Sequence, residues 1–431
     1  MITMRAMTRR LGAATVRAGA FVFFPVIVSV LRKRHRTLIW AGAPLINLKY
    51  WASAMREIGS ECETLVSSTY VINARADYDL LYEDVVPRWI PSAFRKRVAP
   101  YAAFFHIVAH ASIVHISFEG GPLGTTPVWR QEARLLRRAG IRTVVIPYGA
   151  DAFIYSRVPD LLIRHGLLLS YPLGGRYEDL VEERVRYWSR VADVVVADFA
   201  LEVMPRWDVL VSHVLSIDTT QWRKNGRHST ADARTAKVRV LHAPNHRGAK
   251  GTEFVVAAIE DLRADGLDVE LVLAERMPND EIRKLMSEVD VLVDQLLLPY
   301  GLTAVEAMAM SLPVVSNLAD PALTTVFDIY SSLGECPVVA ATPATVTQTL
   351  RALVTEPELR EQLGRAGRRY VEKYHSYDAA RHLFGSIHTS LRGDPDVELG
   401  TLFHPILSEY NKRSPRVEHP LVNHRLPPER G

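Results

Sequence analysis

Cysteine is scarce in this chain. Among 431 residues only Cys62 and Cys336 occur, too few for a disulfide framework or a four-cysteine zinc site. The sequence also lacks HExxH, Walker A and G-x-S-x-G motifs and shows no Cys/His spacing typical of a metal site. We therefore expect a cytoplasmic protein in a reducing compartment, with no bound metal and no cofactor.

Acidic residues are missing from the first 36 positions, which carry eight Arg and Lys side chains. Because the whole chain has a formal net charge of +4 and this segment carries +8, the remainder carries −4. A mildly acidic body does not fit a protein that neutralises nucleic-acid phosphates, although the isoelectric point is near 9.0. We therefore expect no nucleic-acid partner.

Long apolar runs are also missing. The uncharged stretch 18–31 holds fourteen residues and contains Pro25. As a helix it would span about 21 Å, short of the roughly 30 Å hydrocarbon core of a bilayer. We interpret residues 1–36 as a peripheral anchor on an anionic membrane surface, at the inner face of the membrane. The alternative is that these residues are an over-long start of the chain, which leads directly into the first buried strand.

The remaining chain alternates short β-branched strands with amphipathic helices. Strands are predicted at 37–41, 64–67, 113–118, 143–147, 193–197, 208–211, 238–242, 269–274, 291–294 and 313–316. Helices are predicted between 45 and 59 and at 127–140, 178–191, 252–264, 280–288, 303–310, 343–355, 357–374 and 378–391, with a loop-rich region up to about 100. Because the strands show no in–out alternation, they indicate parallel sheets covered by helices on both faces.

The polar, turn-rich stretch 223–236 separates two halves that repeat this pattern. We predict an α/β protein with two Rossmann-like β/α/β domains, 37–222 and 237–385, facing across a cleft. The tail 386–431 is the end of the last helix followed by a Pro-rich arm or disordered segment. Ligands of such sheets bind at the carboxyl ends of the strands, so the cleft is the expected site.

The most informative motif covers residues 300–316, YGLTAVEAMAMSLPVVS. It predicts a loop ending at Gly301 and a helix opening near Thr303, with Glu306 in the first turn. Free backbone N–H groups at a helix start stabilise an acid and can bind phosphate or sugar oxygens. By spacing alone, Glu306 either caps its helix or binds a ligand there.

This motif resembles the nucleotide-sugar signature of the group-1 (GT4-like) retaining glycosyltransferases of the GT-B fold, E-x-F-G-x-x-x-x-E-A-M-A-x-G-x-P-V. The matching residues are Gly301, Glu306, Ala307, Met308, Ala309, Pro313 and Val314. The resemblance implies that Glu306 holds the ribose hydroxyls of a nucleotide-diphosphate sugar. It also implies that the loop of Gly301, Leu302 and Thr303 approaches the diphosphate and the sugar. The domain 237–385 is then the nucleotide-sugar domain, and 37–222 the acceptor-side domain.

A second segment, 242–252, contains Arg247 and Lys250 before Gly251. It resembles the Arg…Lys-Gly segment of the same family, whose two cations neutralise the donor diphosphate. Fixed cations and helix N-termini would then replace a metal at the leaving group. Taken alone, the segment also fits a solvated basic loop.

The first half offers further candidates at strand ends. Gly42 ends the first strand, where the fold lets a backbone loop approach the donor phosphates, and Glu119 follows the strand 113–118 on the cleft side. Asp151 borders the acceptor site implied by the resemblance, where it is either an acid/base or a helix cap. Glu119 and Asp151 are the candidate catalytic residues, whereas His115 lies inside an apolar strand and is interpreted as a core histidine.

The resemblance implies a metal-independent, hexosyltransferase-like glycosyltransferase of glycan or glycolipid synthesis. Its partners would be a nucleotide sugar and a glycan, lipid-linked or small-molecule acceptor. Two positions depart from the signature: Leu298 stands where the family has its first Glu, and Ser311 where it has Gly. Leu298 keeps open a catalytically silent GT-B partner subunit, and a nucleotide-sugar epimerase of the same fold is the other alternative.

Overall fold

The chain forms two compact units in a computed structural model that describes residues 23–31, 37–70, 73–199, 201, 203–223, 228–275, 277–319 and 321–426. The first unit comprises Met1–Ala152, Asp179–Val209 and Phe384–Leu399, and the second comprises Phe153–Glu178, Leu210–Leu383 and Gly400–Gly431. The segment 153–178 therefore packs with the second unit. The polar stretch 223–236, which we expected to be a linker, also lies within the second unit.

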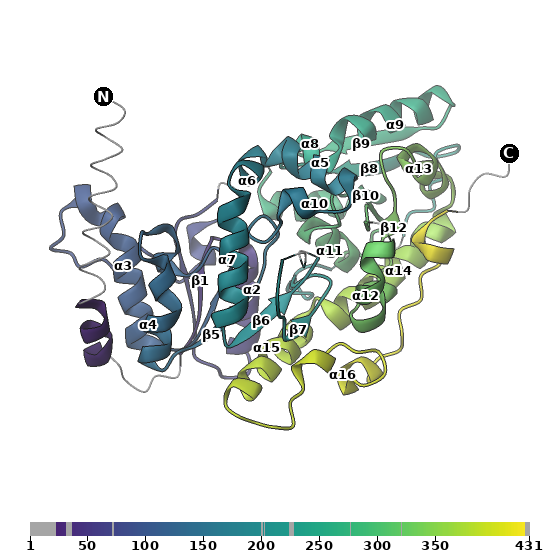
Figure 1. Ribbon diagram of the computed structural model, residues 1–431. Helices are drawn as coiled ribbons and strands as arrows, with labels where there is room; N and C mark the ends of the chain where they lie inside the picture. The colour runs from purple at the N-terminus through teal and green to yellow at the C-terminus, as the bar shows by residue number, and fades with distance from the viewer. Residues whose placement is uncertain are drawn as a thin grey trace. The chain divides into compact units, whose positions relative to one another are not determined.

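The first unit contains a seven-stranded sheet in the order β3-β2-β1-β4-β5-β6-β7. Figure 1 labels β1, β5, β6 and β7 of this sheet. Its strands are β1 (Thr37–Gly42), β2 (Cys62–Val66), β3 (Leu80–Leu81), β4 (Ala111–Ile116), β5 (Arg142–Val145), β6 (Val194–Ala197) and β7 (Val209–Leu210). Its main helices are α2 (Ile46–Arg56), α3 (Ser92–His110), α4 (Glu132–Ala139) and α7 (Glu178–Val191). The chain leaves β1 toward one edge and β4 toward the other, so the topological switch point lies between β1 and β4.

The core of the first unit is aromatic near the middle of this sheet. Trp40 of β1 stacks on His115 of β4, with ring centroids 4.3 Å apart. The second half of α15 (Tyr377–Leu391) adds Phe384 and His388, and the Nε2 atoms of His115 and His388 lie 2.9 Å apart. Burial lowers the pKa of both histidines, that of His388 to about 3, so the pair is neutral. His115 is thus a core histidine, as we expected.

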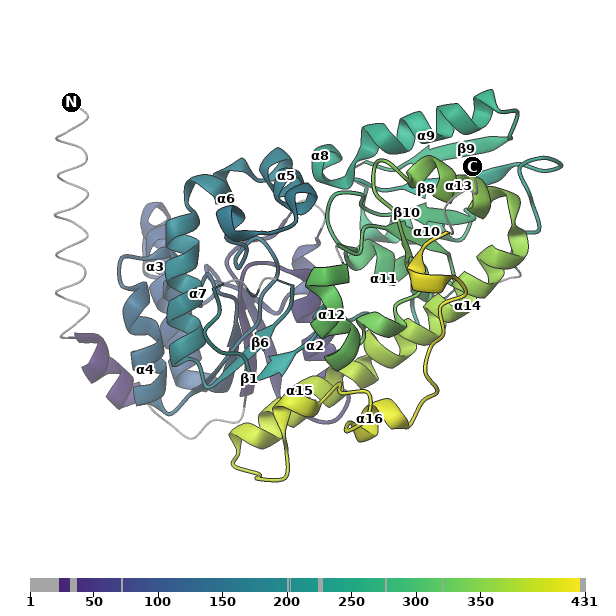
Figure 2. The same ribbon diagram turned by 45° about the vertical axis from the view of Figure 1, so that its right-hand side comes forward.

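The second unit contains a five-stranded sheet in the order β12-β11-β10-β8-β9. Figure 2 shows β8, β9 and β10 of this sheet. Its strands are β8 (Val238–His242), β9 (Val269–Leu273), β10 (Val291–Val293), β11 (Val314–Ser316) and β12 (Val339–Ala340). Its helices include α5 (Leu161–Ser170), α6 (Pro172–Arg176), α8 (Arg247–Lys250), α9 (Thr252–Ala264), α10 (Asn279–Met286), α11 (Leu302–Ala309), α12 (Pro321–Tyr330), α13 (Val346–Thr355), α14 (Pro357–Tyr374) and α16 (Glu409–Lys412). The pairs β8–β9, β8–β10, β10–β11 and β11–β12 are parallel, and the switch point lies between β8 and β10.

One expectation about local structure was wrong in the first half. We expected a loop-rich region up to about residue 100, but α3 begins at Ser92, directly after Pro91. Proline fits the start of a helix because its missing N–H would have no intrahelical partner there. The mixture of proline and basic residues in this stretch hid a helix that buries Ala103, Phe104 and Ile107.

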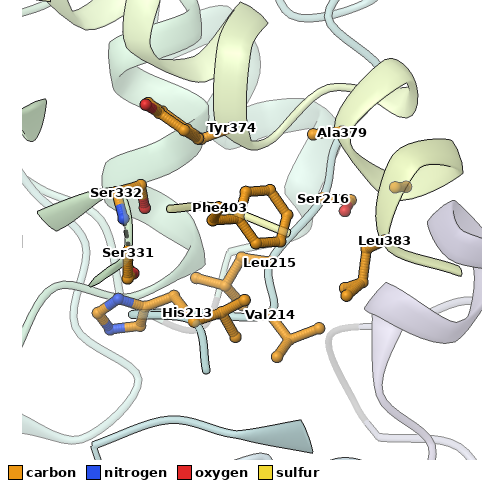
Figure 3. Close-up of a pocket in the computed structure, with 12 residues that line it drawn as sticks. His213, Val214, Leu215, Ser216, Ser331, Ser332, Tyr374, Ala379, Leu383 and Phe403 are labelled. Carbon is orange, nitrogen blue, oxygen red and sulfur yellow. Dashed lines mark hydrogen bonds between the residues drawn. The ribbon is translucent and has the colours of Figure 1, made fainter. Parts of the chain in front are cut away.

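The C-terminal tail was expected to be an arm or a disordered segment, and its described part is neither detached nor disordered. The Tyr410 hydroxyl donates to the Lys373 carbonyl at 2.7 Å, and the Val417 N–H donates to Glu335 at 2.8 Å. Glu335 also accepts from Lys373 Nζ at 2.9 Å in a buried ion pair. Phe403 lines a small cavity among side chains of the second unit (Figure 3). A few spaced apolar anchors fix the tail, and proline-rich composition does not reveal them.

The N-terminal segment is described only over residues 23–31, which are helical. Val28 is fully buried, and Phe24 packs against Tyr101 and Phe104 of α3. Its eight basic residues, on which the anchor interpretation depends, lie outside the described residues. Among the described helices, none is both long and apolar enough to cross a bilayer.

Candidate active site

A buried ion pair occupies the switch point of the second unit. Lys250, at the end of α8 after β8, donates from Nζ to Asp294 Oδ1 at 2.6 Å. Asp294 directly follows β10, its side chain is fully buried, and that of Lys250 is 9% exposed. Parallel sheets bind ligands where such strands end, so Lys250 lies at the edge of the sheet where a ligand is expected.

Asp294 joins this lysine to the loop before α11. Its other oxygen, Oδ2, accepts from the Gly301 N–H at 2.7 Å. The next N–H groups, of Leu302 and Thr303, open the helix and have no carbonyl one turn earlier within it. Sequence reasoning missed Asp294. An aspartate directly after a buried strand, at a carboxyl sheet edge, is the signal that would have found it.

Glu306 lies in the second turn of α11 and not in the first, because the N-cap is Gly301. The prediction of a first-turn acid, and the alternative that Glu306 caps the helix, are therefore wrong. The side chain is 3% exposed, and Oε1 accepts from Asn279 Nδ2 at 3.2 Å. Burial raises the pKa of Glu306 to about 8; Asn279 and Lys250 oppose this shift, and the Asp294 charge adds to it. A nearly buried carboxyl with one amide donor retains lone pairs for a ligand hydroxyl.

None of the ion pairs between the described residues joins Arg247 to this cluster. It lies on α8 with a side chain 44% exposed and pairs with Glu253 at 2.7 Å and Glu275 at 2.8 Å. The hydrogen bonds to Glu253 and then to Glu275 raise its pKa. The two cations of the segment thus differ: Lys250 is buried at the switch point, and Arg247 is held on the surface by two acids.

The position of the missing family glutamate is an apolar packing site. Leu298 packs against a cluster of the second unit that includes Ile163 and Leu167 of α5. A Cβ on Gly166 would lie 2.8 Å from the Leu297 Cβ, so α5 approaches this loop closely. Ser170 Oγ accepts from the Ala249 N–H at 3.0 Å, which ties α5 to the loop that carries Lys250. Sequence reasoning missed α5 altogether, although 161–169 is mostly leucine.

The second departure from the signature is conformationally explained. Ser311 has a φ of 59°, in the left-handed region that favours glycine. Its carbonyl oxygen would lie 2.1 Å from a Cβ on Gly364 of α14, so α14 packs directly under this turn. Serine adopts this left-handed backbone at a small cost in strain, whereas glycine adopts it freely.

The first unit has its own cluster at the switch point between β1 and β4. Gly42 has a φ of +125°, and a Cβ there would lie 3.6 Å from the Gly120 carbonyl oxygen. Glu132 of α4, which is fully buried, accepts from the Gly121 N–H at 3.1 Å and the Leu123 N–H at 3.0 Å. Burial raises the pKa of Glu132 to about 8. Glu132 therefore fixes the glycine-rich loop after β4, a role that the sequence did not indicate.

Asp151 ties together the loops that follow β4 and β5. Its two oxygens accept from the Phe118 N–H and the Tyr148 N–H, both at 2.9 Å. Burial raises the pKa of Asp151 to about 7, against the effect of these two hydrogen bonds. Glu119 is half-buried beside it and hydrogen-bonded to Tyr148, whose pKa is raised first by burial and then by the charges of Asp151 and Glu119. The structure therefore brings Glu119 and Asp151 together at one sheet edge.

Comparison with known proteins gives no match to any protein-family model and none to a curated protein. The chain is similar to the solved structure of the Anabaena HepE protein in complex with UDP-glucose, with a TM-score of 0.51 and 11% identity over 83% of this chain and 100% of the other. It is also similar to an alpha-glucosyltransferase in complex with UDP and a 13-mer DNA containing an A:G mismatch, with a TM-score of 0.50 and 13% identity over 83% and 100% of the two chains. At these identities the likeness shows the fold. The predicted class, α/β with two parallel Rossmann-like sheets of the GT-B type, is confirmed.

Proposed function

We propose that this protein is a glycosyltransferase that moves a sugar from a nucleotide-diphosphate donor to an acceptor with retention at the anomeric carbon. The observation that carries the proposal is the cluster at the switch point of the second unit. There Lys250, Asp294 and the N–H of Gly301 are linked by hydrogen bonds, and the buried Glu306 lies on the helix that follows. The GT-B fold and the signature resemblance support it.

In the proposed reaction the donor diphosphate lies beside Lys250 and the first N–H groups of α11, which face the charge that develops on the leaving group. Glu306 accepts hydrogen bonds from the ribose hydroxyls, and the loop at Gly301, Leu302 and Thr303 positions the sugar. Arg247 contributes only after exchanging one of its two carboxylate partners for phosphate. No metal and no cofactor are assigned a role.

The transfer step breaks the bond between the anomeric carbon and the phosphate oxygen and forms a bond from that carbon to the acceptor oxygen. The acceptor proton passes to the departing phosphate on the same face of the sugar. Glu119 orients the acceptor hydroxyl, Asp151 holds the two loops around it, and Gly42 gives the backbone room near the phosphates. The acceptor is a glycan, a lipid-linked sugar or a small molecule of glycan or glycolipid synthesis.

A donor screen tests this function. A nucleotide-diphosphate sugar that binds the folded protein raises its melting temperature in proportion to the logarithm of its concentration over Kd. The stabilising donor is then incubated with the protein, alone and with acceptor candidates. Transfer or slow donor hydrolysis supports the proposal. Inversion at C2 would identify an epimerase, and binding without turnover a silent subunit.

Glu119→Gln is expected to lower kcat about a hundredfold with donor affinity unchanged, because a misplaced acceptor hydroxyl costs on the order of 10²-fold in rate. The measurement is steady-state transfer combined with donor binding by calorimetry. Glu83→Gln, which changes another half-buried carboxylate of the same unit, is the matched control and should keep parental kinetics. Parental turnover in Glu119→Gln would remove Glu119 from the reaction.

We further propose that residues 1–22 bring the protein to an anionic membrane surface. Deleting them is expected to weaken its binding to anionic vesicles in sedimentation while its melting temperature changes little. The deletion stops before residue 23 because Phe24 and Val28 pack on α3, so removing 23–31 would expose part of the core of the first unit. A large fall in melting temperature on deleting 1–22 would show that this segment belongs to the folded core.

A further inference from the structure

Two aromatic side chains are exposed where α3 begins. Trp89 is 79% exposed, more than any other aromatic side chain in the described part of the chain, and Phe94 is 53% exposed. Large aromatic side chains are usually at least partly buried, because exposing their apolar surface to water is unfavourable. Two of them five residues apart therefore indicate a surface that another phase or molecule covers.

Three exposed cations neighbour these aromatic side chains in the sequence. Arg88, Lys96 and Arg97 are exposed, and none of the ion pairs between described residues includes them. The sequence contains no acidic residue between Asp84 and Glu119, so no nearby carboxylate in this stretch offsets the charge. Arg95 differs, because it turns inward and donates to the carbonyl groups that precede the helix, which fixes the loop carrying Trp89.

The same side of α3 continues into a second apolar surface. Phe94, Arg97 and Tyr101 recur at helical spacing along one face, and Tyr101 contacts Phe24 of the segment 23–31. That segment lies beside α3 (Figure 1). On its other face, the segment exposes Phe23, Val26, Ile27 and Val30.

We propose that Arg88, Trp89, Phe94, Lys96 and Arg97, here called the α3 tip, form a docking site for an anionic lipid surface. Tryptophan prefers the boundary between headgroups and acyl chains, and each Lys or Arg near an anionic leaflet is attracted to lipid phosphates. A protein partner would require roughly 800 Å² on each side, and five side chains at one helix start do not supply that area. The inference does not depend on glycosyl transfer, and it places a membrane contact in the folded unit, separate from residues 1–22.

Vesicle binding of the full-length chain tests the α3 tip. We expect binding to vesicles of phosphatidylcholine with phosphatidylglycerol, weakening with salt, and little binding to phosphatidylcholine alone. Two double variants, Trp89→Ser/Phe94→Ser and Lys96→Glu/Arg97→Glu, are each expected to weaken binding at least about tenfold. The first loses the aromatic side chains that prefer the interface. The second loses two cations, and each lysine or arginine near the surface contributes roughly 1 kcal/mol. The matched controls are Trp207→Ser, another exposed tryptophan, and Arg190→Glu, an exposed arginine of the same unit. Unchanged binding of both tip variants would overturn the proposal.

A local probe separates the α3 tip from the N-terminal residues. Trp89→Cys, made together with Cys62→Ser, carries an environment-sensitive fluorophore, and the remaining Cys336 is buried. A blue shift on adding anionic vesicles is expected, because the label enters the interface. Protein that sediments with vesicles without a shift would show that the tip stays in water. An equal shift with a soluble polyanion and no lipid would show that the ligand is not a membrane, and both results overturn the proposal.

Discussion

Lys250→Ala is expected to lower donor affinity about a hundredfold and turnover with it, while also destabilising the protein. Lys250 Nζ lies 2.6 Å from Asp294 Oδ1 in a buried pair at the switch point of the second sheet. Removing the cation takes away the positive charge that we propose binds the diphosphate. It also leaves the Asp294 charge buried without its partner. Losing one partner of a buried ion pair costs roughly 3–5 kcal/mol of folding stability. Losing a charge-assisted hydrogen bond to the donor diphosphate costs roughly 1.5–3 kcal/mol, which corresponds to about ten- to a hundredfold in binding.

A matched control separates binding from stability. Lys373 is also a buried lysine of the second unit, paired with Glu335 at 2.9 Å, but it fixes the C-terminal tail and has no proposed contact with the donor. Lys373→Ala should therefore lower the melting temperature to a similar extent and keep the donor affinity of the folded protein. Calorimetric titration well below both melting temperatures makes the comparison. Equal donor affinity in the two variants would contradict the diphosphate role of Lys250.

Glu306→Gln is expected to weaken donor binding about ten- to a hundredfold without weakening the fold. A carboxylate that accepts from two ribose hydroxyls makes charge-assisted hydrogen bonds, which are stronger than those of an amide. Glutamine keeps the shape of the side chain and one acceptor oxygen but loses the charge. Glu335→Gln is the control for loss of a buried carboxylate in the same unit, and it should leave donor affinity unchanged while lowering stability. A large loss of stability in Glu306→Gln with unchanged donor affinity would make Glu306 structural.

The raised pKa of Glu306 gives this prediction a pH dependence. With a pKa of about 8 in the fold and 4.5 as its ordinary value, the folded protein takes up a proton that the unfolded chain lacks between these pH values. This group therefore makes the protein less stable as pH rises from 4.5 to 8 and adds nothing further above that range. Glu306→Gln removes this effect. The melting temperature of the variant, measured relative to that of the parent protein, should therefore increase as pH rises.

Donor binding should titrate with the same group. If the ribose needs the carboxylate, binding below pH 8 releases the proton held by Glu306, and affinity rises by up to about tenfold per pH unit before levelling off. Calorimetry in two buffers of different ionisation enthalpy measures the released proton. We expect this proton release to disappear in Glu306→Gln. If Glu306→Gln still releases a proton on donor binding, the proton comes from another group.

Most of the strands and several of the helices were readable from the sequence, because buried parallel strands have no polar face. β-branched runs such as 238–242 and 291–294 coincide with β8 and β10 within a residue, and the helix predicted at 252–264 is α9. Gly42 likewise marked the end of the first strand correctly, since β1 ends at this glycine. Strands and helices of this kind depend on residues that are close to one another in the chain, so local sequence patterns predict them.

The start of α3 and the C-terminal tail were not readable in this way. Proline and arginine around residue 91 suggest a loop, and only the apolar face that α3 buries makes the helix stable there. The tail is held by separate contacts, such as Val417 to Glu335 and Tyr410 to Lys373, with partners between 37 and 82 residues away in the chain. Average composition cannot reveal anchors of that kind.

The sequence by itself determined the fold class and named Lys250, Gly301 and Glu306, because strand patterns and a short motif are local in the chain. Only the tertiary structure decided how these residues are connected. Asp294 joins Lys250 to Gly301 from 44 and 7 residues away, since neighbouring parallel strands bring their carboxyl ends to one edge. It also decided the protonation of Glu306 and the exposure of Trp89, because burial and solvent contact depend on what packs around a side chain and not on its place in the sequence.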